Sequence, residues 1–247
     1  SSAWTEFGAG ANKSELTTRL TQEKEGFVIK GAKHFCTGLE GATIIHVLLD
    51  ASTNNTKAPT FIRVSTETSG VNISEIYALL GLRGSSTGTI TLQDVAINKD
   101  SIIGSIGSGE AMMKENHSFF MNPGLIAMGV ASAAFHEARA SILGKSPNSR
   151  DITGFQSCRF KLVEMEEKLS QIYALATNAV IQSSQIKVVP SSVFLKIKLS
   201  ASEVAVAIAS GAMRLAGGRG FHTDWPFERH LRDAYATVLM GPANRTN

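Results

Sequence analysis

The chain has little cysteine, no long apolar run and no excess of charge of either sign. Only two of its 247 residues are cysteine, Cys36 and Cys158, and neither lies in a C-x-x-C or Cys/His spacing. This argues against a disulfide framework and against a metal site. No apolar run reaches the length of a membrane span, and the first residues lack the charged and apolar regions of a signal peptide. We therefore expect a cytoplasmic protein of a reducing compartment, with no membrane insertion.

The charged residues are few and balanced. Lys and Arg number 24 against 21 Asp and Glu, which gives a formal net charge of +3, and the basic residues are scattered. Because a scattered distribution provides no basic stripe to follow a phosphate backbone, nucleic acid is not an expected partner. With 43% hydrophobic residues, the chain can build the core of one large domain or two smaller ones.

The first part of the chain has the alternating pattern of β-strands. Short apolar runs, separated by turn-forming clusters, predict strands at residues 26–30, 43–49, 60–64 and 89–95. Such short strands favour an antiparallel sheet or small barrel. We assign this domain to residues 1–103.

From residue 104 the apolar side chains recur every three or four positions, as on one face of a helix. One helix is expected over residues 110–143, bent near Pro123 because proline lacks a backbone donor. Another lies within residues 152–185, and its apolar stripe is a plausible contact with a second subunit.

A further helix follows Pro190 and ends at the glycine pair 217–218. We assign residues 104–247 to an antiparallel α-helical bundle. The predicted fold class is α+β, a sheet domain followed by a bundle.

Four short segments resemble motifs of the acyl-CoA dehydrogenase flavoproteins, and they occur in the order found in that family. The segments are WTEFGAGAN at 4–12, GAKHFCTG at 31–38, GLRGSST at 81–87, and GGRGF at 217–221 followed by PFERHLRDA at 226–234. Each is weak alone, but together they extend over nearly the whole chain.

The resemblance implies a flavin cofactor, FAD or alternatively FMN. Phe35 would pack on the isoalloxazine ring and Thr37 would approach flavin N5, because an aromatic face offers stacking area and a hydroxyl can hold a ring atom in register. The glycine pair would let backbone amides approach the dinucleotide. The full set of expected cofactor-binding residues is Trp4, Thr5, Phe35, Cys36, Thr37, Gln156, Arg214, Gly217 and Gly218.

The sequence departs from the family at the expected catalytic base. The family's glutamate corresponds to Gly241, and its alternative position corresponds to Phe119; neither residue can take a proton. Glu115 lies four residues before Phe119 and would share its helix face if the helix is unbroken, so it is the candidate catalytic residue. The family's Arg-x-x-Phe-Gly clamp on FAD is replaced by KSPNSR at 145–150.

The resemblance also implies a preceding helical domain, which this sequence lacks, so we expect a fragment of a longer protein. The expected function is a flavin-dependent oxidoreductase that acts on the CH–CH group of an acyl thioester. Alternatives are a flavin-dependent monooxygenase that uses reduced FMN and oxygen on an apolar substrate, or a non-catalytic binding or structural subunit. A flavin reductase or electron-transfer partner and a homodimer or homotetramer are also implied.

Overall fold

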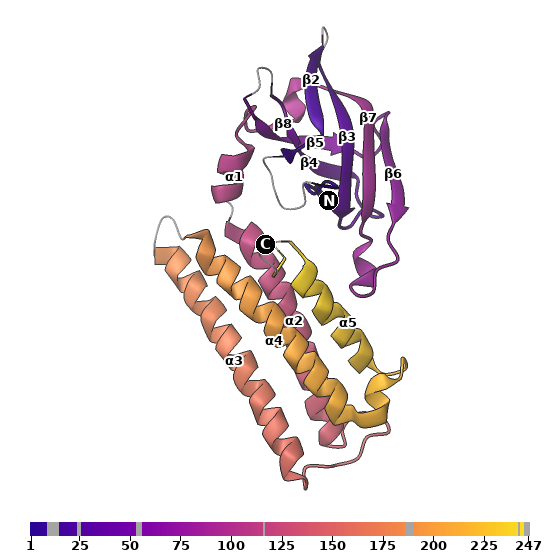
Figure 1. The fold of residues 1–247 in the computed structure, drawn as a ribbon, viewed down its shortest axis with the longest axis vertical. Coiled ribbons are helices and arrows are strands. Elements are labelled where there is room, and N and C mark those ends of the chain that lie inside the picture. Colours follow the sequence, from indigo (N-terminus) through magenta and orange to yellow (C-terminus); the bar gives the residue numbers. More distant parts are fainter. Residues whose placement is uncertain are drawn as a thin grey trace. The chain divides into compact units, whose positions relative to one another are not determined.

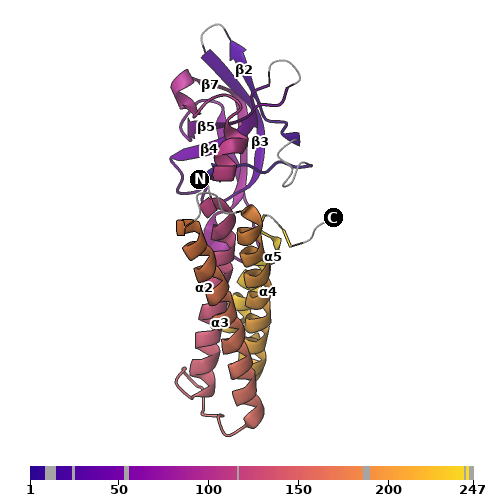
Figure 2. The same cartoon turned by 90° about the vertical axis from the view of Figure 1, so that its left-hand side faces the viewer.

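The computed structural model describes residues 1–8, 15–23, 26–52, 56–115, 117–185, 190–241 and 243–244. These residues form two compact units (Figures 1 and 2). The sheet unit comprises residues 1–79 and 83–115, and the helical unit comprises residues 80–82 and 116–247. Each unit is described by itself.

The sheet unit contains one open sheet of eight described strands (Figure 1). The strands are β1 Ser2–Ala3, β2 Arg19–Glu23, β3 Gly26–Cys36, β4 Ile44–Asp50, β5 Pro59–Ser65, β6 Val71–Ile76, β7 Gly88–Ile97 and β8 Ile102–Ile103. Their order is β6-β7-β3-β2-β4-β5-β8, with β1 beside β4. Most neighbours are antiparallel, as expected, but β1 and β2 each pair in parallel with β4, so the sheet is mixed.

The core of the sheet unit follows the alternation of its strands. Ile45, Val47 and Leu49 on β4 are fully buried, and Ile90 and Leu92 on β7 are buried in the same cluster. Burial of each such side chain stabilises the fold by about 1.5–3 kcal/mol. The unit also contains the short helices η2 Arg83–Ser85 and η3 Lys99–Ser101, and α1 Gly109–Glu115.

The helical unit consists of long helices that lie side by side (Figure 2). Its described helices are α2 His117–Ile142, α3 Gln156–Gln185, α4 Ser191–Ala216, η4 Gly217–Phe221 and α5 Pro226–Leu239. Helix α4 contacts α2, α3 and α5. Because it contacts these three helices, it buries a wide face that includes Ile197, Ser202 and Gly211.

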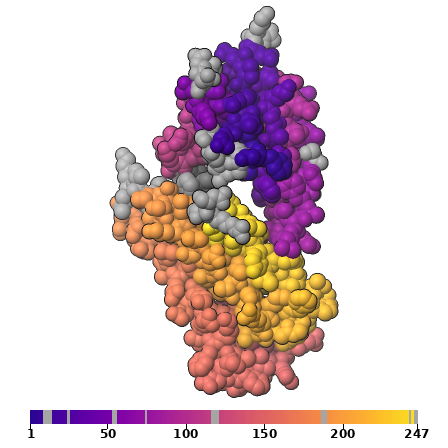
Figure 3. All heavy atoms as spheres, in the orientation of Figure 1, coloured from indigo at the N-terminus to yellow at the C-terminus, as the bar shows by residue number. Residues whose placement is uncertain are grey.

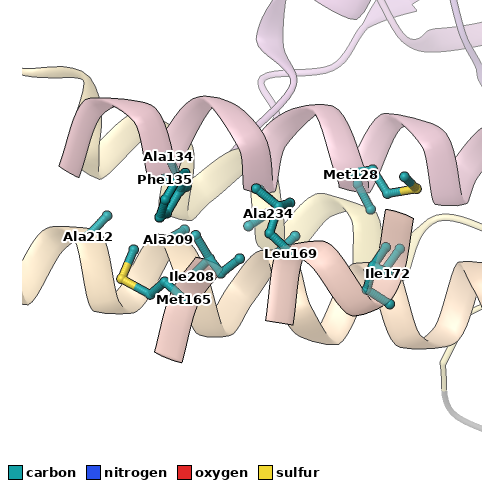
Figure 4. Close-up of a cluster of buried hydrophobic side chains, with 14 of the residues drawn as sticks. Met128, Ala134, Phe135, Met165, Leu169, Ile172, Ile208, Ala209, Ala212 and Ala234 are labelled. Carbon is teal, nitrogen blue, oxygen red and sulfur yellow. The ribbon is translucent and has the colours of Figure 1, made fainter. Parts of the chain in front are cut away.

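The core of the bundle combines large side chains with many alanines. Figure 4 shows Phe135, Met165 and Leu169 between alanines of neighbouring helices. Small residues let helix backbones approach, while the larger ones fill the remaining space. In the space-filling view the atoms of α3, α4 and α5 lie directly against one another (Figure 3). None of the helices in the described ranges is long and apolar enough to cross a membrane.

The predicted helices after residue 152 are confirmed, and α4 ends at Gly217, whose φ of 64° suits glycine. The expected helix over 110–143 is described in two parts, α1 Gly109–Glu115 and α2 His117–Ile142, and residue 116 between them lies outside the described residues. Helix α2 continues through Pro123.

Residues 80–82 belong to the helical unit although sheet-unit residues precede and follow them. The Leu82 N–H donates to the carboxylate of Asp233 at 2.6 Å, and Arg232 donates to the Leu80 carbonyl at 2.7 Å. Arg232 is held in turn by two hydrogen bonds to Glu228, at 2.6 and 2.9 Å. The charged residues of α5 therefore fix this segment.

Candidate functional site

The end of β3 carries a local irregularity that changes which side chains face outward. Between Lys33 and Cys36 the strand advances three residues, while the paired segment of β7 advances two, from Ile90 to Gly88. This is the spacing of a β-bulge, in which one extra residue is accommodated. Lys33 and Cys36 are both fully buried, so the two residues between them lie on the outer side.

Phe35 is one of these two outer residues. Its φ is 54°, in the left-handed region, and 56% of its surface is exposed. A non-glycine residue in this conformation costs about 1–3 kcal/mol and occurs where the surrounding structure requires it. The exposed Phe35 ring is therefore presented by a backbone conformation that costs free energy.

An ion pair lies directly beneath this bulge. Lys33 Nζ donates to Glu6 Oε1 at 2.5 Å, and both side chains are almost completely buried. Glu6 also accepts from the backbone and hydroxyl of Thr17 and from the Thr18 N–H. Burial would raise the pKa of Glu6, but the hydrogen bonds from Lys33, Thr17 and Thr18 outweigh it and lower the pKa to about 2.

Thr37 and Cys36 have different surroundings although they are adjacent. Thr37 is exposed, and its hydroxyl lies 3.3 Å from the Thr87 hydroxyl. The following Gly38 N–H donates to the Ser85 carbonyl at 2.7 Å, so the 85–87 segment and the 37–38 segment are joined. The Cys36 thiol points into the core, and burial raises its pKa to about 12.

The first residues of the chain lie beside the same strand. The His34 N–H donates to the Thr5 carbonyl at 2.8 Å, which places Thr5 next to the bulge. The Trp4 ring packs against Phe61, with 5.0 Å between the ring centroids. The glycine-rich remainder of this motif, residues 9–12, lies outside the described residues.

Two residues near the bulge were not anticipated from the sequence. The Tyr77 ring packs against Phe35 in a T-shaped arrangement at 5.3 Å between centroids, and its hydroxyl contacts Thr89 Oγ1 at 2.5 Å. Thr89 Oγ1 also lies 3.1 Å from His34 Nδ1. The sequence shows a tyrosine at 77 and a threonine at 89, but no motif or spacing in it indicates that they lie near Phe35.

The expected dinucleotide-binding residues lie at the end of α4 and the start of α3 in the helical unit. Gly217, Gly218 and Arg214 are exposed. A Cβ built on either glycine would meet no described heavy atom within 4 Å, so a ligand can approach the backbone closely. Gln156 is exposed in the first turn of α3.

Arg219, inside the glycine run, has a structural role. It donates to the Asn148 carbonyl at 2.8 Å and lies 5.7 Å from the ring centroid of Trp225. These contacts tie the turn after α4 to the 141–151 loop and to the segment before α5. The turn that carries Gly217 and Gly218 is therefore anchored from two sides.

Gly241 is exposed two residues beyond the end of α5. The segment around it is held by Lys198 Nζ, which donates to the Val238 carbonyl at 3.3 Å and to Asn244 Oδ1 at 2.7 Å. Burial lowers the pKa of Lys198, and Glu203, which accepts from Asn244 Nδ2 at 2.7 Å, acts against this.

Glu115 is exposed and is the last residue of α1. Residue 116 and the side chain of Phe119 lie outside the described residues, and the shared helix face of Glu115 and Phe119 stays a prediction.

Comparison with known proteins places both units in a class of flavoprotein oxidoreductases. The model described as "Acyl-CoA dehydrogenase, middle domain" matches residues 1–95, and "Acyl-CoA dehydrogenase, C-terminal domain" matches residues 120–244. The chain therefore belongs to the acyl-CoA dehydrogenase family.

Similar proteins agree with this assignment. A 3-(aryl)acrylate reductase of Clostridium sporogenes is 30% identical over 240 residues, which cover 96% of this chain and 63% of that protein. The mitochondrial short-chain specific acyl-CoA dehydrogenase of Homo sapiens is 29% identical over 96% of this chain and 58% of its own length. The solved butyryl-CoA dehydrogenase from Megasphaera elsdenii superimposes with a TM-score of 0.89 at 25% identity, over 98% of this chain and 64% of that chain. The chain thus spans less than two thirds of these relatives.

Proposed function

We propose that this chain is the flavin-binding portion of an oxidoreductase that acts on the CH–CH group of an acyl thioester. The observation that carries the proposal is the exposed Phe35 ring, held in a left-handed conformation beside the exposed Thr37. An exposed aromatic side chain kept in a costly conformation on a rigid strand is typical of a ligand-binding position. Family membership supports flavin as the ligand at this position.

The residues of the sheet unit suit the ring system of a flavin. Phe35 offers an aromatic face for stacking, and Thr37 offers a hydroxyl and a backbone amide to a ring nitrogen or carbonyl. FAD is the proposed cofactor and FMN the alternative; when bound, it accepts a hydride from the substrate's β-carbon. The Glu6–Lys33 pair beneath the bulge keeps this strand end in one conformation.

The residues of the helical unit suit the phosphate and nucleotide portions. Gly217 and Gly218 have open space above their backbones, and Arg214 supplies an exposed guanidinium for an anionic group. Gln156 can donate and accept through its amide. These four residues support FAD over FMN, because only a dinucleotide needs contacts beyond the first phosphate.

Removal of the substrate's α-proton requires a base, and Gly241 cannot supply one. We propose Glu115 for this role because its carboxylate is exposed at the end of α1. An electron-transfer partner would then reoxidise the protein. Assembly as a homodimer or homotetramer through α3 is also proposed, since Val163, Tyr173 and Ile181 are between 45% and 60% exposed on that helix.

A flavin-dependent monooxygenase is the second candidate. It is favoured by one observation, the exposed Gly241 where the family's glutamate stands. Oxygen activation needs a dry pocket rather than a carboxylate at this position. A flavin reductase would be the partner in this case.

The test is to record the flavin spectrum of the purified protein and to mix it anaerobically with a panel of acyl thioesters. The dehydrogenase proposal expects bleaching of the blue absorption band, and Glu115→Gln should slow bleaching by about 100-fold or more. Phe35→Ala should weaken flavin binding, whereas Phe160→Ala, which removes an equally exposed ring from α3, should not. Bound flavin that no thioester bleaches, but that consumes oxygen when reduced, would favour the monooxygenase instead.

A further inference from the structure

The four rings around the β3 bulge form one connected cluster. Phe7 lies on the His34 ring at 3.8 Å between centroids, and Tyr77 meets Phe35 edge-on at 5.3 Å. The two pairs are joined by a single hydroxyl, Thr89 Oγ1, which contacts both His34 Nδ1 and the Tyr77 hydroxyl. The cluster therefore continues from ring to ring through one hydrogen-bonded centre.

Thr89 is fixed on the central part of the sheet. It is 9% exposed on β7, which pairs with β3 on one side and with β6 on the other. Tyr77 directly follows β6, and its N–H donates to the Thr87 carbonyl at 2.8 Å. The hydroxyl at the centre of the cluster is thus attached to a strand that is paired on both sides, while His34 and Phe35 lie at the bulge of β3 and Tyr77 lies just after β6.

Phe35 itself has few means of holding its position. Its side chain is more than half exposed and its backbone is in the left-handed region. Among the described residues Phe35 makes a T-shaped contact with the Tyr77 ring, and the Tyr77 hydroxyl contacts Thr89. Movement of Tyr77 would therefore be transmitted to Phe35.

We propose that Tyr77 and His34 are positioning residues that act through Thr89 to hold Phe35 as a platform for the flavin ring. His34 orients the Thr89 hydroxyl, Thr89 orients Tyr77, and Tyr77 supports the Phe35 ring. The choice of flavin as the occupant rests on the proposed function. The ordering of Phe35 is a property of the protein alone.

The first readout uses flavin-free protein with isotope-labelled phenylalanine rings, in which the Phe35 signal is identified by its loss in Phe35→Leu. Tyr77→Phe keeps the ring and removes the hydroxyl, and Thr89→Val keeps the shape and removes the hydrogen-bonding centre. Both should shift and broaden the Phe35 signal. Thr91→Val is the matched control. Thr91 lies on the same strand as Thr89 but outside the cluster, and its hydroxyl donates to the Asn72 carbonyl at 3.4 Å. This variant should leave the Phe35 signal unchanged.

The second readout is flavin affinity and the visible circular dichroism of bound flavin. Tyr77→Phe and Thr89→Val should raise the flavin Kd about two- to tenfold and reduce the dichroism, as expected for one lost hydrogen bond. His34→Asn, which retains a side-chain hydrogen-bonding group, should bind flavin more tightly than His34→Ala.

The proposal is overturned if Phe35 gives the wild-type signal in both Tyr77→Phe and Thr89→Val, or if Thr91→Val changes it equally. Should Thr89→Val fail to fold, Tyr77→Phe decides alone. If the wild-type protein binds neither FAD nor FMN, the proposed function fails, and the Phe35 signal still determines whether the cluster orders the ring.

Discussion

Replacing Glu6 by glutamine should destabilise the sheet unit strongly. The carboxylate accepts hydrogen bonds from the Lys33 ammonium, the Thr17 N–H and hydroxyl, and the Thr18 N–H. Glutamine keeps one acceptor oxygen and turns an amino group toward the remaining donors. It also removes the negative charge beside a lysine whose side chain is fully buried.

The expected loss is about 3–5 kcal/mol in the free energy of unfolding, because the change removes the carboxylate that is paired with the buried Lys33 ammonium. Lys33→Met should cost less, since it removes the buried cation and leaves a carboxylate that retains its bonds from Thr17 and Thr18. The double variant should be more stable than the sum of the two losses predicts, because neither charge then remains.

The two tryptophans allow each unit to be followed separately. Trp4 packs on Phe61 in the sheet unit, while Trp225 lies in the helical unit. Urea unfolding followed by fluorescence in a Trp225→Phe background therefore reports the sheet unit. Glu110→Gln is the control, because Glu110 pairs with Lys114 on the surface, with side chains 65% and 74% exposed; its effect should stay within about 0.5 kcal/mol.

The reasoning would be refuted if Glu6→Gln cost less than about 1 kcal/mol, the range of an exposed pair. Strict additivity of the two single changes would refute it equally, because it would show that the two side chains do not interact. In the protein that retains both tryptophans, a loss of stability reported by Trp225 alone would place the effect in the helical unit and would also contradict the reasoning.

Three further outcomes are expected. Folding lowers the pKa of Glu6 from 4.5 to about 2, so its contribution to stability is complete above pH 4.5 and is lost as the pH falls toward 2. Acid titration of Trp4 fluorescence should show this loss. In Glu6→Gln the stability of the sheet unit should depend less on pH over the same range. Gly81→Ala would place a Cβ 2.3 Å from a backbone oxygen of α5, and it should destabilise the helical unit by about 1–3 kcal/mol in urea unfolding. Gly84→Ala, whose Cβ would meet no described atom within 4 Å, should leave the stability unchanged. Alkylation at pH 8 followed by mass spectrometry should modify the half-buried Cys158 before Cys36, whose pKa burial raises to about 12; equal rates would contradict the buried placement of Cys36.

The sequence predicted the helical unit well where periodicity and end signals coincided. Met165, Leu169 and Ile172 are spaced as one helix face, and they lie in the bundle core. Gly217 ends α4 as its residue type suggests.

The sheet was predicted in kind but not in detail. Alternation identifies which residues face a core, but it contains no information on strand direction, so the parallel pairing of β1 and β2 with β4 was not foreseen. The burial of Lys33 was not predicted, because its neighbours in the chain are Ala32 and the polar His34. Its partner Glu6 was not predicted either, because the pair is 27 residues apart in the chain.

The candidate site was approached through resemblance rather than through spacing. The roles assigned to Phe35, Thr37 and Gly217 stay predictions, although the exposure of all three is consistent with them. The connection of Tyr77 to His34 through Thr89 required three strands to be in register. That information exists only in the folded sheet.

The segment 80–82 has a consequence for how the chain must fold. Leu82 leaves the ribosome 151 residues before Asp233, the residue that accepts its N–H. The helical unit therefore lacks one of its own pieces in any polypeptide that begins after residue 82, and a separately produced bundle should gain stability from a peptide containing residues 79–83. The helical unit therefore cannot complete its contacts from the residues of its helices alone, and it requires a segment that is synthesised within the sequence of the sheet unit.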